Sequence, residues 1–121
     1  MLHFTDATPI YLFTRPADMR KSFDGLSGLV AEHFDAEALT GGALFVFLNR
    51  RRDRMKVMYF DHDGLAIWYK RLERGRYELP RFDGEASRLT IDARQLRLIL
   101  DGIDLHSVRH RQRYRRVRRG A

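Results

Sequence analysis

Three apolar segments in close succession constrain most strongly what this chain can fold into. Residues 43–48 are continuously apolar, and residues 55–60 and 65–70 follow after short polar loops. Strands of this length joined by short loops pair as antiparallel neighbours. The sequence therefore predicts an antiparallel meander. The first of its strands has no polar position, so we expect it to be buried on both faces.

Shorter β-prone runs lie on either side of this meander. Residues 10–13 follow Pro9, and because proline is confined to special places in sheets, we expect an edge strand there. After a turn at residues 73–76, residues 77–79 are a candidate for a further strand, which Pro80 ends. The sheet would then contain about four to five strands.

Two helices are expected to pack on this sheet. Apolar residues at spacings of three and four predict a first helix over about residues 19–34, with Asp18 as its N-cap. This apolar face consists of Phe23, Leu26, Val30 and Phe34. Gly25 and Gly28 would each weaken the helix by about 1 kcal/mol, which indicates close packing against another backbone.

The second helix is predicted over about residues 92–101, and Gly102 stands where a helix C-terminus favours glycine. Its apolar face consists of Leu96, Ile99, Leu100 and Ile103. The predicted fold class is therefore α+β: a small antiparallel β-meander packed by two α-helices, with a basic C-terminal arm. We expect residues 1–108 to form a single domain and residues 109–121 to form a flexible, arginine-rich tail.

Composition excludes several classes of function. The 121 residues include no cysteine, so disulfides, thiolate metal sites and cysteine nucleophiles are absent. The five histidines lack the spacing of metal ligands, and no glycine-rich phosphate loop is present, so we expect neither a metal nor a cofactor. Without a bilayer-length apolar run or a secretory signal, the protein is expected to be cytoplasmic, without membrane contact, and nucleoid-associated if it binds DNA.

The net charge of +7 is concentrated near the C-terminus. Seven of the 23 Lys and Arg residues fall within residues 109–121, which contain no acid, and the 16 that remain balance the 16 Asp and Glu residues. A near-neutral body with a cationic arm is typical of a protein that binds a polyanion. The alternative is a solvated arm that keeps the protein soluble or contacts an acidic partner.

Six strings of residues occur in an order shared with one known family. They are residues 17–26, 44–47, 49–56, 61–64, 69–77 and 100–104. In these strings the chain resembles the TnpB-type (Orf2-like) accessory proteins of the insertion-sequence family numbered sixty-six. Ser22 stands where this family usually has glycine. Arg52 stands where glycine is common, a change that adds charge to a loop and removes a residue suited to a tight turn.

The resemblance implies a bacterial accessory protein of transposition, encoded beside a separate, larger transposase and without an established catalytic activity. Our first hypothesis is a non-catalytic protein that binds nucleic acid, with DNA at the element ends as its ligand, and assists the transposase. The second is an interaction adaptor that binds the transposase or another element-encoded protein with little direct DNA contact. An exposed edge strand at residues 10–13 would also allow a homo-oligomer.

The candidate nucleic-acid-binding residues form three groups, all of them cations except Tyr114, which could stack on a base. One lies in the loop after the first meander strand, one around the third strand, and one in the arm. Arginine binds phosphate through two parallel hydrogen bonds and stays charged at any cellular pH. The candidates are Arg50, Arg51, Arg52, Arg54 and Lys56; Lys70, Arg71, Arg74 and Arg76; and Arg109, Arg111, Arg113, Tyr114, Arg115, Arg116, Arg118 and Arg119.

These groups also have structural alternatives. Residues 50–54 would equally suit an exposed turn in which Asp53 pairs with a neighbouring arginine, an interaction worth under about 1 kcal/mol. Trp68 and Tyr69 point to opposite faces of a strand, and for Trp68 we favour packing over base stacking. Arg20 and Lys21 would lie in the first turn of the first helix, where cations oppose the helix dipole, and this indicates a use beyond stability.

Asp61 and Asp63 around His62 suggest a third hypothesis, a metal-dependent nuclease. Nuclease metal sites need carboxylates that converge from separate elements. These two are local and are followed by Gly64, a composition typical of a tight turn. We therefore favour a turn in which Gly64 adopts a positive φ.

Overall fold

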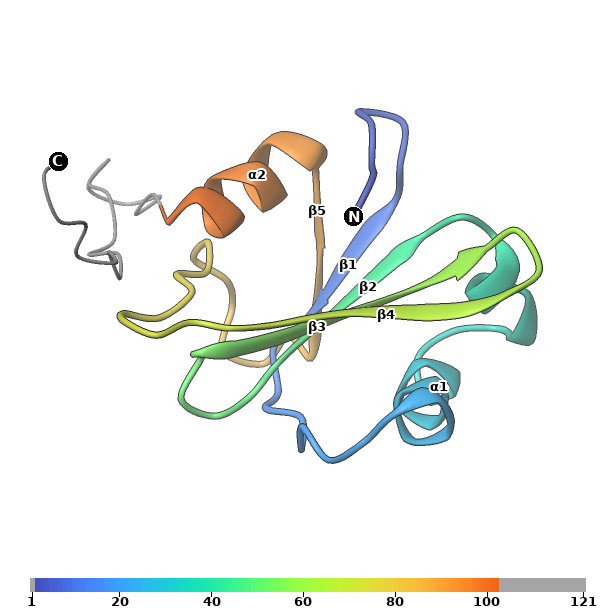
Figure 1. Ribbon diagram of the computed structural model, residues 1–121, viewed down its shortest axis with the longest axis horizontal. Helices are drawn as coiled ribbons and strands as arrows, with labels where there is room; N and C mark the ends of the chain where they lie inside the picture. The colour runs from blue at the N-terminus through green and yellow to red at the C-terminus, as the bar shows by residue number, and fades with distance from the viewer. Residues whose placement is uncertain (1, 103–121) are drawn as a thin grey trace, which may run out of the picture.

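The computed structural model describes residues 2–102, which form a five-stranded sheet with one α-helix on each side (Figure 1). The predicted arm, residues 109–121, lies outside the described residues. The elements in chain order are β1 (Ile10–Phe13), α1 (Phe23–Ala31), a 3₁₀ helix η1 (Ala36–Thr40), β2 (Leu44–Leu48), β3 (Arg54–Asp61), β4 (Gly64–Arg71), β5 (Arg88–Ile91) and α2 (Ala93–Asp101). The α+β fold class is confirmed.

The predicted meander is present as β2, β3 and β4, which pair in antiparallel fashion. The strand order is β4-β3-β2-β1-β5. The prediction of an edge strand at β1 was wrong, because β1 pairs in parallel with β2 and antiparallel with β5. Pro9 precedes the first residue of β1 and contributes only its carbonyl, which accepts a 2.9 Å hydrogen bond from the Leu44 amide. At that position its missing N–H costs no strand pairing.

The further strand lies elsewhere than expected. Residues 77–79 are not a strand, although Tyr77 and Leu79 are buried in the core and the Tyr77 amide donates to the Arg52 carbonyl at 2.7 Å. The additional strand is β5, directly before the second helix, in a segment for which no strand had been predicted. It completes the sheet on the open side of β1.

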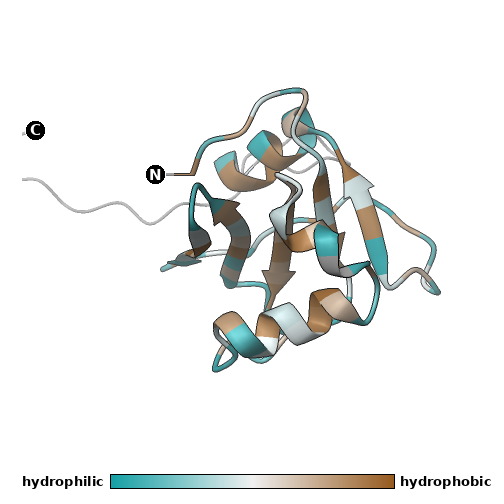
Figure 2. Ribbon diagram, turned by 90° about the vertical axis from the view of Figure 1, so that its right-hand side faces the viewer, coloured by the Kyte–Doolittle hydropathy of each residue, from teal (hydrophilic) through white to brown (hydrophobic). Residues whose placement is uncertain are grey.

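The two sides of the sheet have different cores. On the α1 side, Leu26 and Val30 pack with the aromatic rings of Phe13, Phe45 and Phe47. On the α2 side, the core is mainly aliphatic and consists of Ile10, Leu12, Leu44, Val46, Leu48, Met55, Val57, Tyr77, Leu79, Ile91, Ala93, Leu96 and Ile99. Figure 2 shows the strands between the two helices as mostly hydrophobic. As predicted, β2 is buried on both faces.

The first helix begins later than predicted, at Phe23, with Ser22 as an N-cap that makes no side-chain hydrogen bond. The assignment of Asp18 as N-cap was therefore wrong. The expected close backbone contact at the helix glycines is also absent. A Cβ on Gly25 would meet only the Lys21 side chain, at 3.0 Å, and one on Gly28 would meet nothing within 4 Å.

The second helix ends and begins as predicted. Asp92 is its N-cap and accepts a hydrogen bond from the Gln95 amide, while the Gln95 side chain accepts from the Asp92 amide. This reciprocal pair satisfies two amides that the helix itself leaves without acceptors. Gly102 follows with a φ of 80°, a left-handed conformation that glycine adopts without strain.

Candidate nucleic-acid interface

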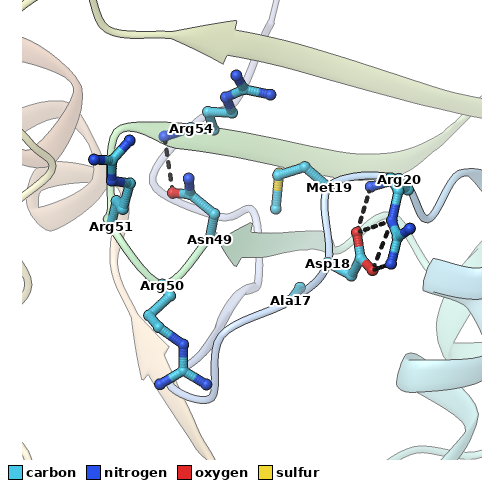
Figure 3. Close-up of a pocket in the computed structure, with 8 residues that line it drawn as sticks. All are labelled: Ala17, Asp18, Met19, Arg20, Asn49, Arg50, Arg51 and Arg54. Atoms are coloured by element: carbon cyan, nitrogen blue, oxygen red, sulfur yellow. Dashed lines mark hydrogen bonds and ion pairs between the residues drawn. The ribbon is translucent and has the colours of Figure 1, made fainter.

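A cationic depression lies where the β2–β3 loop faces the segment between β1 and α1 (Figure 3). Its volume is about 470 Å³, and its lining consists of Ala17, Asp18, Met19, Arg20, Asn49, Arg50, Arg51 and Arg54. Four of these eight residues are arginines and only one is an acid. In Figure 3 the arginines extend in different directions around the depression and do not meet at one point.

The β2–β3 loop is held by its own polar side chains. The side-chain nitrogen of Asn49 donates to a carboxylate oxygen of Asp53 at 2.7 Å. The side-chain oxygen of Asn49 accepts from the backbone N–H of Arg54 at 3.0 Å. The Asn49 carbonyl also accepts from the amide of Arg52, at 3.0 Å. Asp53 is therefore bonded to Asn49 and not to a neighbouring arginine, so the ion pair expected in the structural alternative is absent.

This arrangement leaves two arginines of the loop without internal partners. Within residues 2–102, the exposed side chains of Arg50 and Arg51 take part in no hydrogen bond or ion pair. Arg52 has a positive φ of 59° and does not line the depression. Glycine adopts a φ of this kind without strain, whereas a residue with a Cβ adopts it at a cost.

The opposite wall is a turn centred on Asp18. The Asp18 carboxylate accepts from the Arg20 amide at 2.9 Å and from the Arg20 guanidinium at 2.7 to 3.1 Å. These hydrogen bonds lower the pKa of Asp18 to about 2 and raise the pKa of Arg20 above its usual value. The turn is joined to the sheet because the Ala17 amide donates to the Leu48 carbonyl at 2.8 Å.

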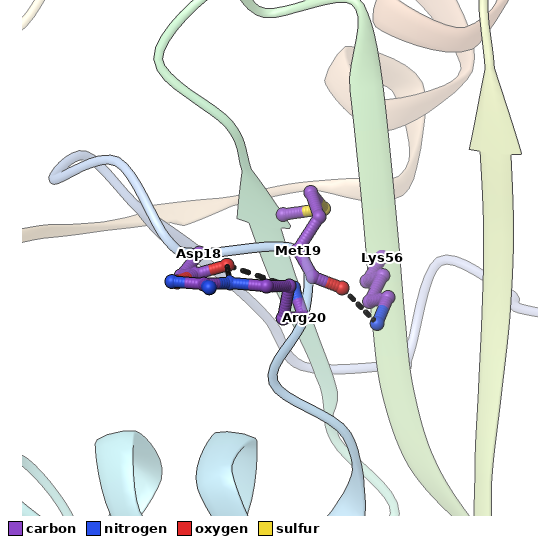
Figure 4. Close-up of polar contacts among 4 residues, drawn as sticks. All are labelled: Asp18, Met19, Arg20 and Lys56. Atoms are coloured by element: carbon purple, nitrogen blue, oxygen red, sulfur yellow. Dashed lines mark hydrogen bonds and ion pairs between the residues drawn. The ribbon is translucent and has the colours of Figure 1, made fainter.

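Lys56, on the neighbouring strand β3, holds the same turn from the side of the sheet (Figure 4). Only 7% of this residue is exposed, and its ammonium group donates 2.7 Å hydrogen bonds to the carbonyls of Met19 and Lys21. Lys56 had been predicted to bind nucleic acid. Its ammonium group is instead directed at backbone of its own chain, so any contribution to binding would come through the position of the turn.

The α1 face of β3 and β4 extends this cationic surface toward the sheet edge. Arg54 pairs in register with Arg71, and Lys56 pairs with Tyr69, so that these four side chains share one face. Arg54 donates to the Tyr69 hydroxyl at 3.3 Å, and Arg71 forms a 3.3 Å ion pair with Glu73. Arg54 thus belongs both to the depression and to this face of the sheet.

The remaining predicted site residues are separated from the depression. Lys70 pairs with Met55, whose side chain belongs to the α2-side core, so Lys70 lies on the other face. Arg74 and Arg76 lie in the loop after β4 and do not line the depression. Trp68 packs against the α2-side core, as favoured. The predicted residues of the arm lie outside the described residues.

One residue of the depression, Arg20, was absent from the predicted set. Its position at the start of the expected helix had been noted, and the signal was its unfavourable place relative to the helix dipole. The structure shows a different reason for its position, since α1 begins only at Phe23 and Arg20 lies in the Asp18 turn. Sequence spacing alone did not place it opposite Arg50.

The acidic residues at the β3–β4 hairpin form the predicted turn. The Asp63 amide donates to the Asp61 carbonyl at 2.6 Å. The residue at positive φ is His62, at 52°, so the expectation for Gly64 was wrong. Among residues 2–102, no three His, Cys, Asp or Glu side chains are grouped in a way that could hold a metal ion. No helix in this part of the chain is both long and apolar enough to cross a membrane.

The structure is an α+β domain with a cationic depression between the β2–β3 loop and the segment that joins β1 to α1. Comparisons with known proteins give the family. Residues 8–110 match the family described as IS66 Orf2 like protein, and the chain belongs to this family. It is therefore a transposition-associated accessory protein. The family is one of accessory proteins and not a known catalytic one.

Two similar proteins come from Sinorhizobium fredii (strain NBRC 101917 / NGR234). The uncharacterized protein y4hO is 37% identical over 95 residues, which cover 78% of this chain and 80% of the relative. The uncharacterized protein y4jC is 30% identical over 102 residues, covering 84% and 85%. No solved structure matches the chain.

Proposed function

We propose that this protein is a non-catalytic accessory protein that binds nucleic acid at the ends of an insertion sequence and thereby assists a separate transposase. The observation that carries the proposal is the cationic depression, in which Arg50 and Arg51 are exposed and lack partners within residues 2–102. An arginine that has no acidic partner within the protein keeps its full charge for an external anion.

The arrangement of these arginines favours a polyanion over a single small anion. A site for one phosphate needs donors that converge on it, whereas here the guanidinium groups extend around the depression (Figure 3). Successive phosphates of a nucleic-acid strand would meet such separated cations one by one. The arginine-rich residues 109–119 would add non-specific affinity to the same ligand.

A comparison of two double variants tests this proposal. Arg50→Gln with Arg51→Gln removes two charges from the depression, and Arg81→Gln with Arg94→Gln removes two exposed charges that do not line it. Binding to a fluorescent element-end duplex and to a single strand is measured over a salt series. On duplex DNA, the first variant is expected to lose about tenfold in affinity at low salt, and its salt slope to fall by about 0.9 per lost phosphate contact. Equal losses in both variants would show that the depression has no special role.

A third variant is expected to bind nucleic acid more tightly than the wild type. Asp18 is the one acid in the lining, and Asp18→Asn keeps an oxygen that accepts from the Arg20 amide while it removes the negative charge. Arg20 is then free to bind phosphate, so we expect the affinity to rise about two- to fivefold at low salt. An unchanged or weaker affinity would contradict the proposed role of the depression.

The adaptor hypothesis makes a different prediction for the same proteins. An adaptor would co-purify with the transposase and would leave the mobility of DNA fragments nearly unchanged. Wild-type protein that binds none of these nucleic acids at low salt, yet is retained by immobilised transposase, would replace our proposal with that hypothesis.

A further inference from the structure

Tyr69 is one of two large apolar side chains that are strongly exposed in residues 2–102. It lies on the edge strand β4, and 47% of the residue is accessible; the other is Phe23, at 45%. Exposed aromatic area is unfavourable in water unless something covers it. A tyrosine kept for core packing would be directed inward, as Tyr77 is, with 1% exposed.

Two cations hold the Tyr69 ring in place. The ammonium group of Lys56 lies 4.8 Å from the ring centroid, and Arg54 donates to the hydroxyl at 3.3 Å. Lys56 is itself fixed by its two bonds to the backbone of the Asp18 turn. The ring is therefore fixed on its buried side and at its hydroxyl, while nearly half of the residue stays open to solvent.

Arg54 places this ring next to the cationic depression. It lines the depression, and it also bonds the Tyr69 hydroxyl, so an anion bound beside Arg54 would lie close to the aromatic ring. Arg71, the register partner of Arg54, adds a further charge on the same face of the sheet. An aromatic ring beside separated arginines is the combination that binds single strands, in which bases stack on rings while cations follow the phosphates.

We propose that Tyr69 is a stacking platform for an unpaired base, and that the preferred ligand of this face is single-stranded DNA. The inference rests on the proposed nucleic-acid binding and adds the state of the ligand. The bases of a duplex stack on one another and offer no free face inside the helix, whereas an unpaired base does. A pre-positioned ring loses little conformational freedom when the base arrives.

The test uses the full chain and three short DNA ligands. They are a single strand, the same strand with abasic sites in place of all its bases, and the corresponding duplex. Tyr69→Leu removes the ring, and Tyr69→Phe keeps the ring but removes the hydroxyl that bonds Arg54. Arg94→Leu, on the exposed side of α2, is the control for a surface change elsewhere. Circular dichroism and the thermal midpoint of each variant establish that it is folded.

We expect Tyr69→Leu to lose about tenfold in affinity for the single strand, and Tyr69→Phe to recover most of that loss. The duplex affinity should fall less than the single-strand affinity. On the abasic strand the wild type and Tyr69→Leu should bind equally, because no base is present to stack. A 2-aminopurine base in the strand should lose fluorescence on binding to the wild type and to Tyr69→Phe, but much less with Tyr69→Leu.

The inference is overturned if Tyr69→Leu weakens the abasic strand as much as the intact strand, or if it leaves the intact strand unaffected. In either case the losses seen with the Arg50 and Arg51 variant would still support nucleic-acid binding. Failure of the proposed function is different, because the wild type itself would then bind none of the three ligands.

Discussion

The ammonium group of Lys56 donates a 2.7 Å hydrogen bond to the carbonyl of Met19, and this bond joins the second strand of the meander to the turn that carries Arg20. A second 2.7 Å bond, to the Lys21 carbonyl, fixes the turn at two points. The arginine that closes the cationic depression is therefore placed by a buried lysine that does not itself line it.

Replacement of this lysine should cost stability and binding together. Lys56→Met keeps the length of the side chain but leaves both carbonyls without their donor, and we expect the free energy of unfolding to fall by about 2 kcal/mol. Urea denaturation measures the change. Lys70→Met, on the opposite face of the adjacent strand, is the control and should stay within about 0.5 kcal/mol of the wild type. A stable Lys56→Met protein with unchanged DNA affinity would show that the turn does not need this support.

The β2–β3 loop contains a position at which glycine is expected to improve stability. Arg52 has a φ of 59°, and the left-handed conformation costs a residue with a Cβ more than it costs glycine. Arg52→Gly should therefore raise the free energy of unfolding by about 1 kcal/mol, after the greater freedom of glycine in the unfolded chain is allowed for. Arg51→Gly, at a position without positive φ, should give no gain. A loss of stability in Arg52→Gly would mean that the arginine side chain contributes more than its backbone strain costs.

The Asp18 carboxyl should titrate far below its usual range. Its folded-state pKa is about 2, against 3.8 for an unperturbed group, chiefly because the Arg20 side chain donates hydrogen bonds to it. A lowered pKa means that ionised Asp18 favours the folded state. This contribution is fully present above about pH 4 and is lost as the pH falls through about 2. Carboxyl-carbon NMR should place the midpoint near 2 in the wild type and higher in Arg20→Gln. An identical midpoint in both proteins would mean that the pair does not persist in solution.

Local patterns were sufficient to predict the meander and the second helix. Strands β2 to β4 are joined by short loops with turn residues, and pairs of this kind are encoded by neighbouring residues. The same holds for α2, in which Asp92 and Gln95 lie three residues apart and Gly102 follows the last turn. In each case the signal and the structure that it specifies lie within a few residues of one another.

Competing contacts, one of them local and the others tertiary, decided the features that the sequence did not reveal. Asp18 has the composition of an N-cap, but its carboxylate is used by Arg20 within a separate turn, and the helix begins five residues further on. Tyr77 suits a strand, yet its amide is bonded to Arg52 outside the sheet. The site shows the same division. The loop arginines could be predicted because they are adjacent in the sequence. The position of Arg20 instead depends on Lys56, which is 36 residues away and bonds the carbonyl of Met19.

The position of β1 between β2 and β5 constrains the order in which the domain assembles. One edge of this apolar strand pairs with β2, and the other pairs with residues 88–91. Nearly all of residues 2–102 must therefore leave the ribosome before the sheet is complete. Until then the nascent chain exposes an unpaired, hydrophobic strand edge of the kind that promotes aggregation. A frameshift or stop codon before residue 88 would therefore yield an aggregation-prone fragment that chaperones and proteases recognise, and not a shorter domain that folds.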